Sequence, residues 1–406
     1  MAVNLDHCKN LLKIDGVSIG ISSAGIKQPG RRDMVLLALV PGSKCACLFT
    51  QNSFAAAPVF VAKAHWQLTG PRYLLINTGN ANAGTGPRGI EDALMCCRVL
   101  AQSAGCRPEE VLPFSTGVIG EYLPTERIMA VIPALVADLN PLNWEAAAFG
   151  IMTTDTVAKG FSTQFKVGGC LYSITGIAKG SGMICPDMAT MLAFIATDAP
   201  VKAEVLQACL KNAVHNSFNR ISVDGDSSTN DAIVLVATGL KGGVGINSTT
   251  GKDYHPFNTA MTQVCQFLAQ AIIRDAEGAT KFISISVQQG WDDDECRQVA
   301  YTLAHSPLIK TAFFASDPNW GRIIAAIGRA GLKDLDISGV SVFLNEVPVV
   351  AAGCRHPDYR EEQGQQVMQQ AEISITVRLN RGTGVSSVWT SDLSHEYVRI
   401  NSDYRS

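Results

Sequence analysis

The chain has 406 residues, of which 47% are hydrophobic and 17% are charged, and its formal net charge is −3. This length allows two domains or one large α/β unit, and the apolar fraction is ample for a buried core. No basic run resembles a nucleic-acid footprint, and no stretch of about 18 uninterrupted apolar residues predicts a membrane span. We therefore expect neither nucleic acid nor a membrane as a partner.

The first twenty residues resemble neither a secretory signal nor an arginine-rich transit peptide, because charged residues interrupt their apolar stretches. The twelve cysteines are scattered along the chain. The closest pairs, Cys45 with Cys47 and Cys96 with Cys97, lack the spacing of a zinc knuckle. These features predict free thiols in a reducing cytoplasm and no metal site.

Strand and helix patterns intermingle throughout the sequence. In chain order they predict strands at 35–40 and 73–76, helices at 89–103 and 126–139, a helix at 202–216, a strand at 233–237, a helix at 259–274, and strands at 282–287 and 340–344. Such a mixture is typical of a layered α/β architecture. We expect two strand-rich halves, one on each side of residue 190.

Between these halves lies the most informative segment, residues 179–198, with the sequence Lys-Gly-Ser-Gly-Met-Ile-Cys-Pro-Asp-Met-Ala-Thr-Met-Leu-Ala-Phe-Ile-Ala-Thr-Asp. A glycine-rich loop leads to Ala189 and Thr190, and the apolar run 191–196 follows. A threonine that heads a buried element after a small residue suits N-terminal-nucleophile chemistry. If the Ala189–Thr190 bond opens, Thr190 carries both a hydroxyl and a free α-amine.

The α-amine matters because a free α-amino group has a reference pKa of about 7.7–8.0, so near neutral pH it can accept the proton of the hydroxyl. The hydroxyl alone is too weak an acid to attack without such a base. Self-cleavage would use the same oxygen, which attacks the Ala189 carbonyl. The acyl group then moves from nitrogen to oxygen, and water hydrolyses the resulting ester. The spacing also fits a buried loop whose threonine bonds a backbone carbonyl, and spacing alone favours that explanation.

The full segment resembles the processing segment of the ornithine acetyltransferase family, which includes the bifunctional glutamate N-acetyltransferases of arginine biosynthesis. Other blocks agree in the family's order. They are Asn-Thr-Gly-Asn-Ala-Asn-Ala-Gly-Thr-Gly at 77–86, Ser-Thr-Gly-Val-Ile-Gly-Glu at 115–121, Met-Thr-Thr-Asp-Thr at 152–156, the acidic block 217–231, Arg-Asp-Ala-Glu-Gly-Ala-Thr-Lys at 274–281, Asp-Pro-Asn-Trp-Gly-Arg at 317–322 and the tail 389–406.

The resemblance implies an α-β-β-α architecture of the kind shared with self-processing aminopeptidases. It implies a precursor cut into an α chain, 1–189, and a β chain, 190–406, which stay interleaved in an α₂β₂ heterotetramer. Thr190 then takes an acetyl group from N²-acetylornithine and passes it to L-glutamate. Some family members also accept acetyl-CoA as a donor, and no bound cofactor is implied.

The resemblance also assigns roles to individual residues. Thr116 and Gly117 match an oxyanion hole, whose donors would stabilise the charge that develops on the acetyl oxygen. Matches to substrate contacts are Thr156, Lys179, Glu277, Asn401 and Ser406. Lys179 suits the α-carboxylate that both substrates share, whereas Glu277 suits the ornithine ammonium but repels the glutamate side chain. Without the resemblance, Ser-Thr-Gly is typical of a turn and a loop lysine of the solvated surface.

Some positions depart from the family's frequent residues. Cys185 stands where histidine or alanine is frequent, and Asp187 stands where asparagine is frequent. Ala276 replaces a frequent glycine, and Ser406 replaces the expected threonine. Cys185 and Asp187, which precede the cut, could slow self-cleavage by changing the loop.

A further set of acids lacks the calcium-loop pattern and is interpreted as turn, cap and network formers: Asp155, Asp224, Asp226 and Asp231.

Two other functions stay open from the sequence. A self-processing aminopeptidase or amidase would use the same threonine but pass its acyl group to water, so product analysis with and without glutamate separates the two. An unprocessed binding protein on the same scaffold would remain a single band on a denaturing gel.

The glycine-rich stretches 79–86 and 239–245 match neither common phosphate-binding pattern, so we expect no nucleotide site there.

Overall fold

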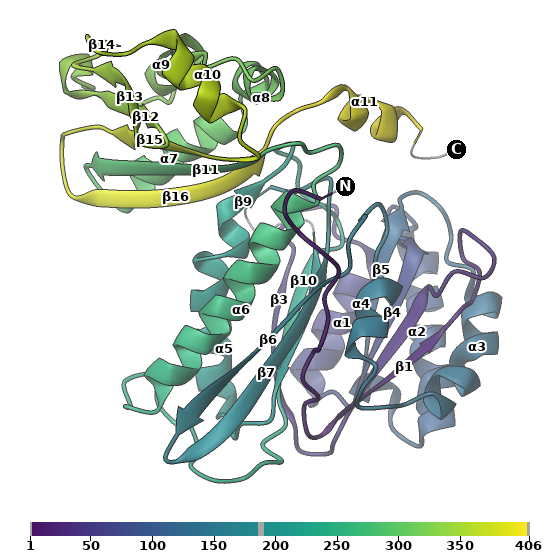
Figure 1. The fold of residues 1–406 in the computed structure, drawn as a ribbon. Coiled ribbons are helices and arrows are strands. Elements are labelled where there is room, and N and C mark those ends of the chain that lie inside the picture. The colour runs from purple at the N-terminus through teal and green to yellow at the C-terminus, as the bar shows by residue number, and fades with distance from the viewer. Residues whose placement is uncertain (1, 186–190, 404–406) are drawn as a thin grey trace.

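The computed structural model describes residues 2–185 and 191–403, which form three β-sheets with helices packed against them (Figure 1). The predicted α/β class is confirmed. Each strand and helix predicted from the sequence is present, and the largest difference in a boundary lies at the start of α6 (Tyr254–Arg274).

Two of the sheets form the sandwich in the lower part of Figure 1. The first has the order β1 (Val17–Ser22), β2 (Met34–Leu39), β4 (Tyr73–Asn80) and β5 (Val111–Val118). The second has the order β3 (Lys44–Phe49), β10 (Ala232–Ala237), β8 (Leu192–Thr197), β7 (Cys170–Lys179) and β6 (Lys159–Val167). The second sheet therefore combines strands that precede residue 190 with strands that follow it. The boundary at residue 190 in the sequence does not coincide with a boundary between the two sheets.

The facing strands show why the apolar runs are continuous. In β2, Val35 and Leu37 belong to the apolar layer between the two sheets, whereas Leu36 packs with the outer helices. Because side chains alternate between the faces of a strand, a strand covered on both faces must be apolar at every position. The rings of Phe114 and Phe194 meet edge to face between the sheets, with centroids 5.2 Å apart.

Helices cover both outer faces of the sandwich. The first sheet carries α2 (Gly86–Ala104) and α3 (Thr125–Ala137), and the second carries α5 (Ala203–His215) and α6. Two shorter helices, α1 (Ala57–Leu68) and α4 (Trp144–Gly150), contribute to the layer between the sheets. The order of layers is thus α-β-β-α, as the resemblance implied.

The third sheet forms a body of its own, which the sequence patterns did not predict. Its order is β14 (Cys354–Arg355), β13 (Val347–Ala351), β12 (Ser341–Leu344), β15 (Glu372–Arg378), β11 (Phe282–Gly290), β16 (Gly384–Ser391) and β9 (Ile221–Ser222). Against it pack α7 (Asp293–Ala304), α8 (Pro307–Phe314), α9 (Trp320–Gly328) and α10 (Glu361–Met368). A bidentate pair between Arg274 and Glu372, at 2.7 and 2.9 Å, joins α6 to this sheet.

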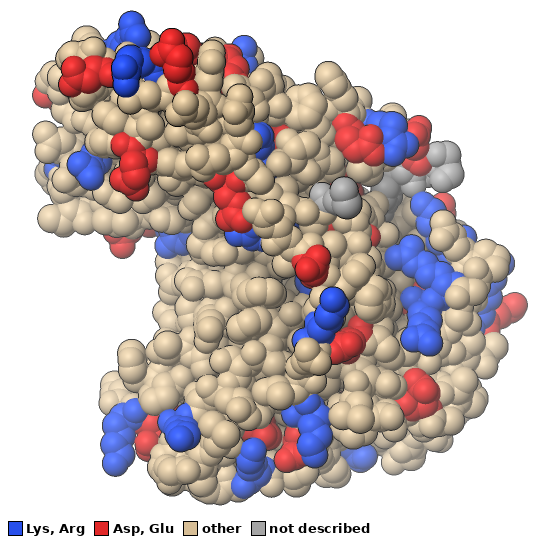
Figure 2. Space-filling view, viewed as in Figure 1, with Lys and Arg blue, Asp and Glu red and all other residues tan. Residues whose placement is uncertain are grey.

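The last helix of the described residues is α11 (His395–Ser402), which extends from the third sheet back over the sandwich (Figure 1). Figure 2 shows that charged side chains on this face form small groups between broad uncharged areas, in keeping with the low charged fraction.

None of the helices in the described ranges is both long and apolar enough to cross a bilayer. The twelve cysteines all lie in those ranges, and no disulfide joins them.

Candidate functional site

A cavity of about 270 Å³ opens at the carboxyl end of β5. Five of the predicted site residues line it: Thr116, Gly117, Lys179, Glu277 and Asn401. The first three precede residue 190 in the chain and the last two follow it. The fold therefore brings together side chains that are far apart in sequence, and it does so at the seam between the two predicted chains.

Gly117 occupies a position that excludes a side chain. Its φ of +137° lies in the region that favours glycine, and a Cβ there would come within 2.2 Å of the carbonyl carbon of Gly79. β4 and β5 pair in parallel with Gly79 opposite Gly117, so the two backbones touch at this point. Because glycine alone permits this approach, only glycine fits at position 117 of the cavity wall, where an oxyanion hole was predicted.

Lys179 ends β7 with its side chain buried, and its Nζ donates a hydrogen bond to Thr116 Oγ1 at 3.3 Å. Burial lowers the pKa of Lys179, although the carboxylates of Asp155, Asp231 and Glu277 oppose that effect. In the described part of the chain, the hydrogen bond that Lys179 Nζ donates goes to a neutral acceptor. A buried ammonium in this setting favours an anion nearby, because the attraction offsets part of the free-energy cost of losing its hydration. A substrate carboxylate in the cavity would supply that anion.

Glu277 faces the same cavity and is 8% exposed. Its Oε2 accepts a hydrogen bond from Asn401 Nδ2 at 2.8 Å. A Cβ on Gly182 would come within 2.4 Å of this carboxylate, so the bare backbone of Gly182 makes the space for it. Lys179 and Glu277 give the cavity one cationic and one anionic side chain, which suits an amino acid with a charge at each end.

The tail is held by hydrogen bonds and by the packing of Tyr397 against the apolar core. Ser394 caps α11, accepting from the Tyr397 N–H at 3.4 Å and donating to the Gly278 carbonyl at 2.6 Å. Tyr397 donates its hydroxyl to Asp224 at 3.1 Å. Val398 is 63% exposed. The anchors place Asn401 over Glu277, so the tail takes part in the cavity wall.

Thr156 is not among the residues that line the cavity. It is exposed, and both its hydroxyl and its backbone N–H donate to Asp275. The predicted cleavage pair Ala189 and Thr190 lies outside the described residues. So do Asp187 and Ser406. Their predicted roles remain predictions.

The structure adds residues near the cut that the sequence did not single out as site residues. Met191, the residue after Thr190, donates its backbone N–H to Asp231 Oδ1 at 2.8 Å. The other carboxylate oxygen of Asp231 is buried and has no hydrogen-bond partner in the described part of the chain. Burial raises the pKa of Asp231 well above its ordinary value. A polar run before an apolar strand, Ser-Ser-Thr-Asn-Asp at 227–231, was the available signal for this group.

Asn230 ties this polar run to the cavity wall. Its Nδ2 donates to the carbonyl oxygens of Ala81 at 2.6 Å and Ser115 at 2.9 Å. Asn230 thereby fixes the strand that carries Thr116 against the start of β10. The interpretation of the acids as network formers is confirmed for Asp155, Asp224 and Asp231, each of which accepts backbone N–H groups.

Of the residues that depart from the family's frequent forms, Cys185 and Ala276 can be placed. Cys185 Sγ lies 3.7 Å from His305 Nε2, so the thiol contacts an imidazole near the end of the loop. Ala276 is buried between Asp275 and Glu277 in the chain. Its side chain belongs to an apolar core cluster, and Glu277 lines the cavity.

Comparison with known proteins matches residues 18–406 to the ArgJ family. The chain is 53% identical over 405 residues to the arginine biosynthesis bifunctional protein ArgJ of Pseudomonas fluorescens (strain Pf0-1), covering 100% of both. It is 52% identical over 395 residues to the protein of that name from Methylococcus capsulatus, covering 97% of this chain and 96% of the relative. A similar solved structure is bifunctional protein argJ from Bacillus halodurans, at 36% identity and a TM-score of 0.49, covering 51% of this chain and 96% of that one.

The closeness of Gly117 to Gly79 gives a direct test of this wall. Gly117→Ala forces the two backbones apart, and we expect the rate of acetyl transfer to fall about 100-fold or more, as on loss of an oxyanion donor. Gly120→Ala is the matched control, because Gly120 also has a positive φ but no atom within 4 Å of its Cβ position. Equal rates for the two variants in a steady-state assay would contradict the assignment.

Proposed function

The chain belongs to the ArgJ family, and we propose that its cavity beside β5 is where it transfers an acetyl group from N²-acetylornithine to L-glutamate. The protein is an acyltransferase of arginine biosynthesis that acts on small molecules. The observation that carries the proposed location is the meeting of Lys179, Glu277 and the Thr116–Gly117 backbone in one cavity. A cation, an anion and a candidate oxyanion hole are the groups that this transfer requires.

The nucleophile in this proposal is Thr190, freed by cleavage after Ala189. Its α-amine takes the hydroxyl proton while Oγ attacks the acetyl carbonyl, and the donors at residues 116 and 117 stabilise the oxyanion. The amine returns the proton to the leaving nitrogen, ornithine departs, and the acetyl group stays as an ester. The glutamate amine then attacks this ester, and N-acetylglutamate leaves. Support comes from β8, which begins at Leu192 in the sheet that also carries Lys179.

Recognition of two substrates with opposite side-chain charges follows from the paired groups in the cavity. Lys179 binds the α-carboxylate that acetylornithine and glutamate share. Glu277 binds the ornithine ammonium. When glutamate is bound, the Asn401 amide, which donates to Glu277 in this structure, donates to the glutamate side chain instead.

The two pieces, 1–189 and 190–406, remain together because the second sheet of the sandwich is shared between them. β8 pairs with β7 from the first piece, and β10 pairs with β3 from the first piece. Separating the pieces would expose these ladders and the apolar layer beside them. Two such heterodimers would form the α₂β₂ assembly, and we place the enzyme in the cytoplasm with its biosynthetic substrates.

The relatives carry the word bifunctional in their names, and we propose acetyl-CoA as a second acetyl donor for this chain. No bound cofactor takes part in the proposal. A second cavity of about 220 Å³ shares Gly117 and Thr154 with the first and is also lined by Lys27, Arg31 and Asp403. This space lets a larger donor reach the same oxyanion donors without displacing Glu277.

The covalent intermediate is the sharpest test of the proposed nucleophile. On rapid mixing with acetylornithine, we expect the 190–406 piece to gain about 42 Da, the mass of one acetyl group on the nucleophile. Thr190→Ala should stay a single chain and gain no mass. Intact-protein mass spectrometry after quenching measures both. A wild-type protein that cleaves itself but never carries the acetyl group would contradict the two-step transfer.

The division of labour in the cavity predicts a selective effect of Glu277→Gln. Removing the anion should raise KM for acetylornithine by about 10- to 100-fold, the usual cost of a lost charged hydrogen bond. KM for glutamate should not rise, because repulsion is removed. Initial rates with each substrate varied in turn measure both values. Glu346→Gln, at an exposed turn, is the control, and an equal rise for both substrates would contradict the assignment.

A further inference from the structure

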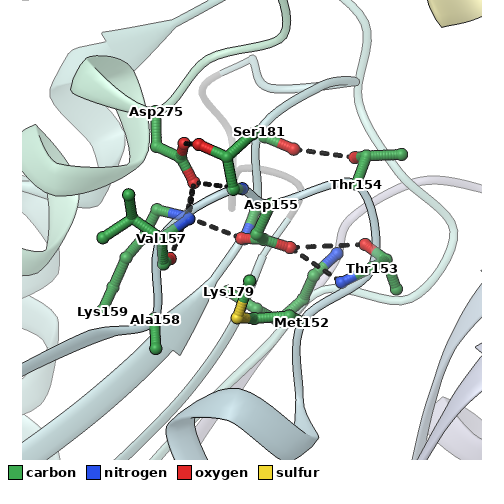
Figure 3. Close-up of polar contacts among 12 residues, drawn as sticks. Met152, Thr153, Thr154, Asp155, Val157, Ala158, Lys159, Lys179, Ser181 and Asp275 are labelled. Carbon is green, nitrogen blue, oxygen red and sulfur yellow. Dashed lines mark hydrogen bonds and ion pairs between the residues drawn. The ribbon is translucent and has the colours of Figure 1, made fainter. Parts of the chain in front are cut away.

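Three charged side chains are buried together next to the cavity, around Lys159 on β6 (Figure 3). Lys159 Nζ lies 2.7 Å from Asp155 Oδ1 and 2.6 Å from Asp275 Oδ2, and these side chains are at most 1% exposed. The ammonium also donates to the Val157 carbonyl at 3.3 Å. All three of its protons therefore have acceptors.

Each carboxylate in turn holds backbone from a different part of the chain (Figure 3). Asp155 accepts from the N–H of Gly180 at 2.7 Å and of Thr153 at 2.9 Å. Asp275 accepts from the N–H groups of residues 156 and 157 at 3.0 and 3.1 Å. The three side chains thus clamp the segments 153–159, 179–181 and 275–277 to one another.

Every one of these segments contributes a residue to the cavity wall. They carry Thr154, Lys179 and Glu277 respectively. Two further bonds tighten the junction, since the Glu277 N–H donates to the Ser181 carbonyl at 2.8 Å and the Ser181 and Thr154 hydroxyls lie 2.7 Å apart. A change in the clamp must therefore move groups that face the substrate.

We propose that Asp155, Lys159 and Asp275 form a positioning triad that sets where Lys179 and Glu277 stand in the cavity, and with them the two charged ends of the substrate. The triad touches no substrate itself. This inference rests on the proposed acetyl transfer. Asp155 acts on Lys179 through the Gly180 N–H and through its charge, and Asp275 acts on Glu277 through the intervening residue.

Stability alone does not account for the triad. Taking three charges out of water is costly, and well-packed apolar residues of similar volume often replace a buried ion cluster with no loss of stability. What apolar residues cannot supply is a set of directed acceptors for four backbone N–H groups, three in the segment 153–159 and one at Gly180. The geometric function is the one for which charges are required.

The charges also bear on Lys179. Burial lowers its pKa and Lys159 adds to that effect, while Asp155, Asp231 and Glu277 raise it. Lys179 must be protonated to bind a carboxylate, so substrate affinity is lost as the pH rises through its pKa. Neutralising Asp155 removes one of the opposing anions, and the loss should then begin at a lower pH.

The test compares Asp155→Asn and Asp275→Asn with the wild-type processed enzyme, using kcat and KM for each substrate across the alkaline range. Asp155→Asn should raise KM for both substrates about tenfold, the cost of weakening one charged hydrogen bond, and move the alkaline limb of kcat/KM to lower pH. Asp275→Asn should raise KM for acetylornithine selectively and leave that limb in place. Lys166→Met, exposed on the same strand, is the control and should match wild type.

Equal losses for both substrates in both variants, with the alkaline limb unmoved, would overturn the triad and leave a merely structural cluster. If neither variant folds by circular dichroism, Lys159→Arg decides the matter. This variant retains the charge but displaces both carboxylates, so wild-type KM values for both substrates would also overturn the proposal. A wild-type enzyme that transfers no acetyl group would refute the proposed function instead, and the two failures are distinct.

Discussion

The ladder between β7 and β8 is the interaction on which the rest of the site depends. It runs in register from Ile174 opposite Thr197 to Lys179 opposite Leu192. The last pair places Lys179 beside the second residue after Thr190, across the predicted cut. On the other side of β8, Leu192 pairs with Ala232, which brings Asp231 to the same level. A shift of one residue would turn every side chain of β8 to the opposite face and empty the site.

Carboxylates outnumber lysines in the buried part of this frame. Lys159 lies between Asp155 and Asp275, and the charges of Asp155, Asp231 and Glu277 raise the pKa of Lys179 against the effect of its burial. Burial alone raises the pKa of Asp155, yet the two lysines lower it well below its ordinary value. Glycines admit these groups where a side chain would collide, as at Gly117 and Gly182. The cavity wall therefore carries one cationic and one anionic side chain, Lys179 and Glu277.

Much of this arrangement was predictable from the sequence, and the remainder has physical reasons for having been missed. Continuous apolar runs identified β2 and β10 because both faces of these strands are covered. Motif resemblance located Thr116, Gly117, Lys179, Glu277 and Asn401. Asp155, Lys159 and Asp275 form one cluster only through tertiary contacts, so no local pattern reveals it. Periodicity likewise does not say which strands share a sheet, and the third sheet was therefore not predicted as a separate body.

In the proposed mechanism the enzyme holds the acetyl group covalently while one substrate leaves the cavity and the other enters it. Exchange of label between free ornithine and N²-acetylornithine, measured with no glutamate present, tests this most directly. The account predicts exchange, because ornithine can leave and return while the acetyl group stays on the protein. Complete absence of exchange in a preparation that transfers acetyl groups to glutamate would contradict it.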